Sequence, residues 1–185
     1  NNAFGNIRGT ALALKKPINV MNIDAHTDLR RLEHRHSGNG FSYAREEGFL
    51  EKYSVFGLAK NYTPQYIFDE MKLARNMNFK LMEELLGKNP SEIIAEFEDS
   101  LEFVRDDDFG LELDCDAISG FPSSAQTPSG LDLNTTRQLL EIAIKKPECR
   151  YLHICEAAPK QNSDFQTGKA LGFFISDANR AFLER

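Results

Sequence analysis

Short apolar runs alternate along this chain with longer segments that have a helical pattern. The runs lie at residues 18–23, 53–58, 78–82, 109–113 and 151–155, and they have the length and the apolar content of strands. The helical patterns lie at residues 3–16, 64–75, 90–104, 134–146 and 164–183. Such alternation is typical of a parallel sheet covered by helices. With 185 residues the chain has room for one sizeable core, so we expect a single α/β domain over residues 1–185.

The net charge argues against nucleic acid as a partner. The formal net charge is -6, and no run of Lys or Arg offsets it, so the chain would repel a phosphate backbone. No apolar stretch reaches membrane-spanning length, and the first residues have neither the basic region nor the apolar core of a signal peptide. We therefore expect a cytoplasmic protein without a membrane segment.

Acidic residues follow two of the predicted strands. Asp24, His26 and Asp28 come directly after residues 18–23, and their i, i+2, i+4 spacing lets them face one side if the extended path continues. Asp114 and Asp116 follow residues 109–113 with the same spacing. Open α/β sheets bind ligands at the carboxyl ends of their strands. Both acidic groups are therefore expected at the ligand-binding site of the protein.

Four carboxylates in one cleft need compensating cations, because they repel one another and burial disfavours their charge. Two divalent ions would neutralise them. Oxygen ligands with a minority of imidazole suit Mn²⁺, with Zn²⁺, Fe²⁺ and Co²⁺ as alternatives. Either group taken alone could instead be a polar turn that caps the next helix or strand. The two groups together favour the metal site.

Four segments in this order resemble the ureohydrolase superfamily of arginase, agmatinase and formimidoylglutamase. Asp-Ala-His-Thr-Asp at residues 24–28 looks like the family's Asp-Ala-His-x-Asp metal motif, and Asp-Cys-Asp at residues 114–116 stands where the family has Asp-x-Asp. The loop at residues 121–130 is similar to the family's Thr-Pro-x-Gly stretch. Cys-Glu-Ala-Ala-Pro at residues 155–159 looks like its Glu-Val-Asn-Pro strand end.

The resemblance implies a three-layer αβα sandwich with a mainly parallel sheet and a site for two Mn²⁺ ions. It implies hydroxide attack on a linear amidine or guanidinium carbon of a small-molecule substrate, and a homo-oligomer. Asp28 is the implied proton shuttle, and Glu156 is the implied partner of the cationic amidine, with a surface acid as its alternative. The implied metal ligands are Asp24, His26, Asp28, Asp114 and Asp116.

The chain departs from the family pattern in two places. The family carries another metal-binding His in a Gly-Gly-x-His-type motif ahead of the first helix, and this sequence has none, so we expect that an N-terminal part of the fold is missing. Where arginases and agmatinases have His-Gly, this chain has Ser37 and Gly38, with His36 one step earlier. His36 is either a substitute catalytic group or a solvated loop residue.

The loop residues favour a substrate with a carboxylate. Ser37 and Asn39 resemble arginase residues that contact the substrate's amino-acid end, and Thr127 belongs to the Thr-Pro-x-Gly-like loop, so all three are candidate substrate-binding residues. Arg30 or Arg35 can pair in bidentate geometry with a substrate carboxylate. A glutamate-derived substrate has such a carboxylate, and agmatine lacks one. We expect hydrolysis of N-formimidoyl-L-glutamate to glutamate and formamide, as in histidine degradation. Arginase or agmatinase activity, or a non-catalytic assembly or regulatory subunit, are the alternatives.

Overall fold

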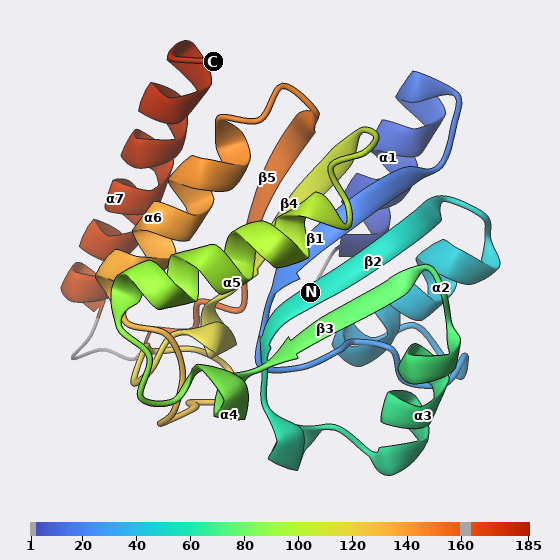
Figure 1. The fold of residues 1–185 in the computed structure, drawn as a ribbon, viewed down its shortest axis with the longest axis horizontal. Helices are drawn as coiled ribbons and strands as arrows, with labels where there is room; N and C mark the ends of the chain where they lie inside the picture. The colour runs from blue at the N-terminus through green and yellow to red at the C-terminus, as the bar shows by residue number, and fades with distance from the viewer. Residues whose placement is uncertain (1–2, 160–163) are drawn as a thin grey trace.

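A five-stranded parallel sheet forms the centre of the computed structural model, which describes residues 3–159 and 164–185. The strands lie side by side in the order β3-β2-β1-β4-β5, so the first strand of the chain is the middle of the sheet (Figure 1). Every strand runs parallel to its neighbours. Their bounds are β1 Ile18–Ile23, β2 Leu50–Leu58, β3 Met77–Leu81, β4 Phe109–Asp114 and β5 Cys149–Cys155.

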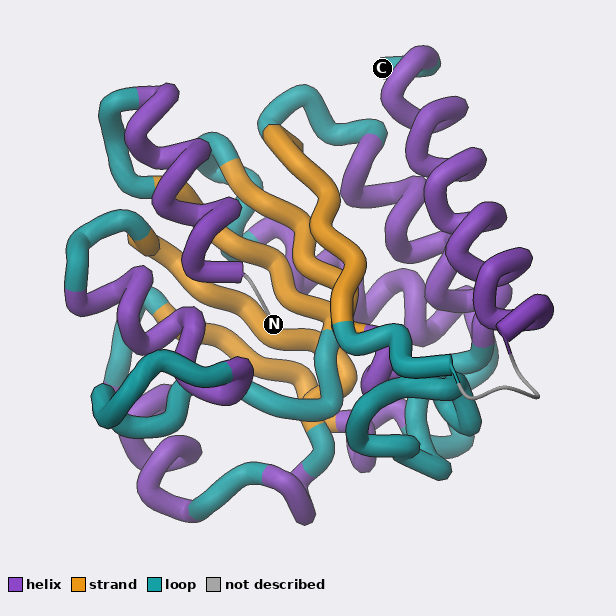
Figure 2. Tube along the Cα trace, turned by 180° about the vertical axis from the view of Figure 1, so that it is seen from behind, coloured by secondary structure: helices purple, strands orange, loops and turns teal. Residues whose placement is uncertain are grey.

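Helices cover both faces of this sheet and make the three-layer αβα arrangement that was predicted. Figure 2 shows one face, which is covered by α1 (Ala3–Leu14), α2 (Gly40–Glu46) and α3 (Gln65–Leu73). The opposite face in Figure 1 carries α4 (Met82–Leu85), α5 (Pro90–Glu102) and α6 (Leu133–Ile144), with α7 (Asp164–Leu183) packed beside α6. Among the described residues, no helix combines the length and apolar character needed to cross a bilayer.

The alternation of side chains along the strands divides the core into two parts. On β1, Val20 faces the α1–α3 layer, whereas Met21 and Ile23 face the layer of α4 to α7. All three are fully buried, as are Leu111 and Leu113 on β4. Strands buried on both faces read as continuous apolar runs, which is why the sequence pattern located them.

Local signals explain several helix boundaries. Asn89 caps α5 by accepting a hydrogen bond from the Glu92 N–H (3.1 Å), while the Glu92 carboxylate accepts one from the Asn89 N–H (2.7 Å). Pro90 follows as the first residue of the helix, as expected. The first helix ends at Leu14, two residues before the predicted end, because Lys15 has a left-handed backbone with φ 57°.

Two helices were not predicted from the sequence. α2 lies directly after the polar loop and buries Phe41 and Ala44, and α4 is a single turn that buries Met82 and Leu85.

β2 begins three residues earlier than expected and has an irregularity beside Gly57, whose φ is 85°. Only glycine adopts this conformation without strain, so Gly57 allows the strand to bend next to the residues that follow β1.

Candidate metal centre

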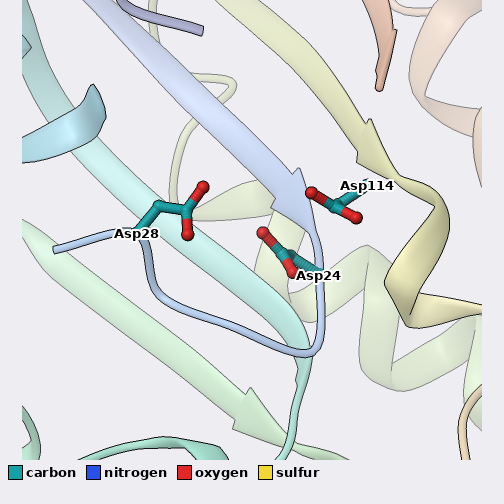
Figure 3. A group of neighbouring side chains, drawn as sticks. All are labelled: Asp24, Asp28 and Asp114. Carbon is teal, nitrogen blue, oxygen red and sulfur yellow. The ribbon is translucent and has the colours of Figure 1, made fainter. Parts of the chain in front are cut away.

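Three carboxyl groups converge where β1 and β4 end. Asp24 directly follows β1, Asp114 is the last residue of β4, and Asp28 lies on the loop after Asp24, as Figure 3 shows. Each of the three offers an oxygen, and these oxygens all lie within 4.8 Å of one another. Because β1 and β4 are neighbouring parallel strands, their carboxyl ends meet at one edge of the sheet. The topology therefore brings together residues that are far apart in sequence.

The loop from Asp24 to Asp28 reaches this arrangement by turning, not by continuing the strand. Asp24 Oδ1 accepts a hydrogen bond from the His26 N–H (2.8 Å), and the Thr27 hydroxyl accepts one from the Leu29 N–H (3.4 Å). Asp28 has a left-handed backbone with φ 49°. The extended path on which the i, i+2, i+4 argument depended does not continue here, because these side-chain acceptors stabilise turns. The turn nevertheless brings Asp24 and Asp28 together.

In the Asp114 to Asp116 segment the strand ends at Asp114, and Cys115–Ala117 form a 3-10 turn in place of the extended path that the spacing argument assumed. Cys115 is fully buried in the core formed with α4 to α7, while the carboxyl groups on either side belong to the site. Asp114 Oδ1 accepts a hydrogen bond from the Asp116 N–H (2.8 Å). Asp116 Oδ1 accepts one from the Ala125 N–H (3.0 Å), which ties the loop at residues 119–130 to the site.

His26 joins the carboxyl groups through its Nδ1 atom. This atom lies 3.5 Å from Asp24 Oδ1 and 3.8 Å from Asp116 Oδ2. The imidazole ring also stacks on Tyr62, with 5.0 Å between ring centroids and 12° between ring planes. Nδ1 is therefore the nitrogen available to a cation shared with these carboxylates.

Burial and mutual repulsion raise the pKa of the clustered carboxyl groups. Loss of solvent raises the pKa of Asp24 well above its ordinary value, and the negative charge of Asp28 raises it further. The same two causes, burial first and then the charge of Asp24, raise the pKa of Asp114 to about 9. Because burial and repulsion disfavour the ionised form of both acids, they need a positive charge nearby to be deprotonated together.

The donor set fits a hard divalent cation. Oxygen ligands on opposite sides of one such ion lie about 4–5 Å apart, which matches the separation of the Asp24, Asp28 and Asp114 oxygens. Carboxylates with one imidazole suit Mn²⁺ and do not resemble a thiol-rich zinc site. The nearby Cys155 thiol contacts Asp114 Oδ2 at 3.5 Å, and burial raises its pKa, which disfavours the thiolate form that binds metal.

An open cavity of about 200 Å³ lies over this centre. Four acidic residues, Asp28, Asp114, Asp116 and Glu156, line it, and Arg30 is its only arginine or lysine among the described lining residues. Glu156 follows β5 with a left-handed backbone, φ 61°. The described residues that line the cavity are His26, Asp28, Arg30, Ser37, Gly38, Asp114, Asp116, Ser124, Ala125 and Glu156.

Four predicted site residues lie outside this described lining. One is the predicted metal ligand Asp24, which is fully buried, and the other three are His36, Asn39 and Thr127. His36 Nδ1 accepts a hydrogen bond from the Gly38 N–H (3.1 Å), so the ring holds its own turn. Asn39 is fully buried, and its amide donates to the carbonyls of Arg31 (3.2 Å) and His34 (3.0 Å). Thr127 is buried, and the structure shows no hydrogen-bond partner for its hydroxyl among the described residues. These positions favour structural roles for His36 and Asn39.

Sequence reasoning missed residues that support the site from neighbouring loops. Ser124 and Ala125 line the cavity because the Ser124 N–H donates to the Glu156 carbonyl (3.1 Å) and the Ala125 N–H donates to Asp116. Backbone donors carry no signal in residue type. Asn22 is buried in β1 and its amide donates to Asp24 Oδ2 (3.1 Å). A polar residue inside an apolar strand was the available signal.

Comparisons with known proteins agree on one family. A model of the arginase family matches residues 1–177. The chain is 30% identical over 179 residues to a formimidoylglutamase of Macrococcus caseolyticus, which covers 94% of this chain and 56% of that protein. It is 31% identical over 163 residues to a formimidoylglutamase of Staphylococcus aureus, with 85% and 51% covered. The chain thus spans about half the length of these curated relatives.

Solved structures share the fold at low sequence identity. The formimidoylglutamase of Bacillus subtilis superposes with a TM-score of 0.85 at 21% identity, over 97% of this chain and 57% of that one. A formiminoglutamase of Trypanosoma cruzi with Mn²⁺ gives a TM-score of 0.84 at 18% identity, over 99% and 62%. The arginase of Bacillus subtilis gives 0.72 at 22% identity, over 95% and 66%. These likenesses concern the fold.

Proposed function

Because the chain belongs to the arginase family, we propose that the protein is a manganese-dependent hydrolase of a linear amidine, with N-formimidoyl-L-glutamate as substrate and glutamate and formamide as products. The observation that carries this proposal is the cavity in which four acidic side chains and one arginine face the same space. A cationic amidine and an anionic carboxylate on one small molecule match these opposite charges.

The two ends of the substrate require different partners. Glu156 pairs with the positive amidine, and Arg30 pairs with a carboxylate, for which its guanidinium offers two parallel donors. The position of Arg30 is fixed at its backbone, since its N–H donates to the Gly38 carbonyl (3.0 Å) and its carbonyl accepts from the Ser42 hydroxyl (2.8 Å). The names of the curated relatives favour the same substrate.

Five residues would hold two Mn²⁺ ions, and one carboxyl group would move a proton. The proposed ligands are Asp24, His26, Asp28, Asp114 and Asp116. Bound divalent ions supply Lewis acidity and lower the pKa of water towards neutrality. Asp28 is the least buried of the three clustered acids and lines the cavity, so its carboxyl can pass a proton to the leaving nitrogen. Asp24 is fully buried and is not in the described lining, and Asp114 lines the cavity but is only 3% exposed.

Three alternatives predict different products. Arginase or agmatinase activity would release urea, and agmatine would leave Arg30 without a carboxylate partner. A non-catalytic subunit would turn over none of these substrates. We therefore propose to supply Mn²⁺ to the complete protein and to measure formamide, urea and ammonia released from N-formimidoyl-L-glutamate, arginine and agmatine. Formamide from the first substrate is expected, and urea as the main product would refute the proposed specificity.

A matched pair of variants tests the role of Arg30. Arg30→Gln is expected to raise KM for N-formimidoyl-L-glutamate by about 10- to 100-fold, because a charged hydrogen bond contributes about 1.5–3 kcal/mol. Arg31→Gln is the control, since Arg31 is the adjacent exposed arginine and is absent from the described lining of the cavity over the centre. An equal rise of KM in both variants would show that general electrostatics, not carboxylate pairing by Arg30, governs binding.

A further inference from the structure

A buried amide and a buried phenol lie beneath the candidate metal centre. Asn22 is the fifth residue of β1 and is fully buried, and Tyr53 on the neighbouring β2 is 1% exposed. The Asn22 amide donates one hydrogen bond to Asp24 Oδ2 (3.1 Å) and another to the Tyr53 hydroxyl (2.9 Å). Neither residue lines the cavity over the centre among the described residues, so neither is placed to contact a substrate.

The Tyr53 hydroxyl continues this connection to the far side of the loop. It donates a hydrogen bond to the Thr27 carbonyl (2.8 Å). The four residues therefore form a chain of hydrogen bonds from Asp24 through Asn22 and Tyr53 to Thr27, which closes the turn from below. Thr27 directly precedes Asp28, whose left-handed backbone is uncommon for a residue other than glycine.

We propose that Asn22 and Tyr53 are positioning residues that fix Asp24 and Asp28 for metal binding. The inference rests on the proposed metal centre. The Asn22 donor takes one lone pair of Asp24 Oδ2 and so directs the remaining lone pairs of that carboxylate. The Tyr53 donor satisfies a carbonyl at the point where the turn carries Asp28 back towards Asp24.

The chemistry of the pair suits this role. Outer hydrogen bonds orient ligands, and their removal typically weakens metal binding by 10- to 100-fold. A neutral amide donates to Asp24 without adding another negative charge to a crowded acidic group. Burial raises the pKa of Tyr53 well above its ordinary value, so its hydroxyl stays protonated and remains a donor. Tyr53 also packs against Phe41, with ring centroids 4.6 Å apart, which fixes the ring.

Tyr53→Phe removes the hydroxyl and keeps the ring, so it tests the hydrogen bond to the Thr27 carbonyl without creating a cavity in the core. Tyr43→Phe is the matched control, because the Tyr43 hydroxyl also donates to a loop carbonyl, that of Glu33 (2.8 Å), away from residues 24–28. Mn²⁺ binding is measured by electron paramagnetic resonance. Amide hydrogen exchange at His26 and Leu29, whose N–H groups bond within the turn, is measured without metal.

We expect Tyr53→Phe to weaken Mn²⁺ binding by about 10- to 100-fold and to speed exchange at His26 and Leu29 by about tenfold. Tyr43→Phe should change neither. Wild-type values in Tyr53→Phe, or equal changes in both variants, would overturn the proposal, and so would a lower unfolding temperature without a selective change at the turn. If the wild-type protein binds no Mn²⁺, the proposed function fails, while the exchange rates still decide whether Tyr53 holds the turn.

Discussion

Replacing Asp114 by Asn should stabilise the metal-free chain and greatly reduce its stabilisation by Mn²⁺. Burial and the charge of Asp24 raise the pKa of Asp114 to about 9 from an ordinary value of 3.8. At pH 7 the carboxyl is therefore protonated in the folded chain and ionised in the unfolded chain. Folding must take up this proton, which costs about 1.4 kcal/mol for each pH unit above the unfolded pKa, or about 4 kcal/mol at pH 7 as an upper bound.

Asparagine avoids this cost because it is neutral in both states. Its side-chain oxygen can still accept the hydrogen bond from the Asp116 N–H that Asp114 Oδ1 accepts. The sign follows from linkage: an acid whose pKa is raised on folding stabilises the chain below its unfolded pKa and loses that contribution as pH rises towards its folded pKa. The advantage of Asp114→Asn should therefore be absent near pH 4, grow with pH, and level off near pH 9.

Urea denaturation of the EDTA-treated proteins at pH 4 and pH 7 measures this advantage. Asp99→Asn serves as the control, because Asp99 is exposed on α5 and far from the acidic group in the fold. With Mn²⁺ at a hundred times its Kd, the wild-type chain should gain about 2.7 kcal/mol, and Asp114→Asn should gain much less. The reasoning is refuted if Asp114→Asn is no more stable than wild type at pH 7, or if its advantage is the same at pH 4.

Three further changes test separate parts of the structure. Tyr62→Ala should weaken Mn²⁺ binding by several-fold in a titration, since it removes the ring that stacks on His26, whereas Tyr62→Phe should retain wild-type affinity. Gly110→Ala should destabilise the chain by about 1–3 kcal/mol in urea denaturation, because the added Cβ would lie 2.2 Å from the Tyr151 ring, and an unchanged midpoint would contradict that packing. Asn89→Ala should lower the free energy of unfolding by about 1 kcal/mol through loss of the α5 cap, and Asn89→Ser should restore most of it.

The sequence predicted the strands better than the short helices. The apolar runs located the central strands β1, β2 and β4 because both of their faces are largely buried. The edge strands β3 and β5 are mostly only partly buried, and the sequence located them by their length and apolar content. α2 was missed because it begins at Gly40, has only seven residues, and owes its stability to the burial of Phe41 and Ala44. Helices this short form through tertiary contacts, which local patterns do not record. The same limit applies to α4.

For the candidate site, the sequence predicted acidic residues that gather after two strands, but not how the chain brings them together. It also named His36, Asn39 and Thr127, which lie outside the described cavity lining. The acidic pairs were found from their position after two strands, and the structure joins Asp24, Asp28 and Asp114 at the end of those strands. The turn at Asp28 and the hydrogen bond from the Asn22 amide could not be predicted, because they depend on neighbours from β2 and on backbone geometry. The strand order brings Asp24 and Asp114 together, since β1 pairs with β4 as well as with β2.

The acidic residues of the candidate site lie at the strand ends, outside the two apolar parts of the core. Asp24 and Asp114 resist ionisation because burial and repulsion act on both, yet each is anchored by a donor that the sheet or its loops already fix. The apolar residues that form the two parts of the core include none of these acids, so the electrostatic cost arises at the strand ends. A cation that binds there relieves this cost, so metal should stabilise the chain against global unfolding and against local opening of the loops that carry the site. On metal removal, amides that exchange through opening of residues 24–29 and 114–125 or through global unfolding should exchange faster, whereas amides that exchange through local openings elsewhere should not change. An equal acceleration at every amide would contradict this expectation.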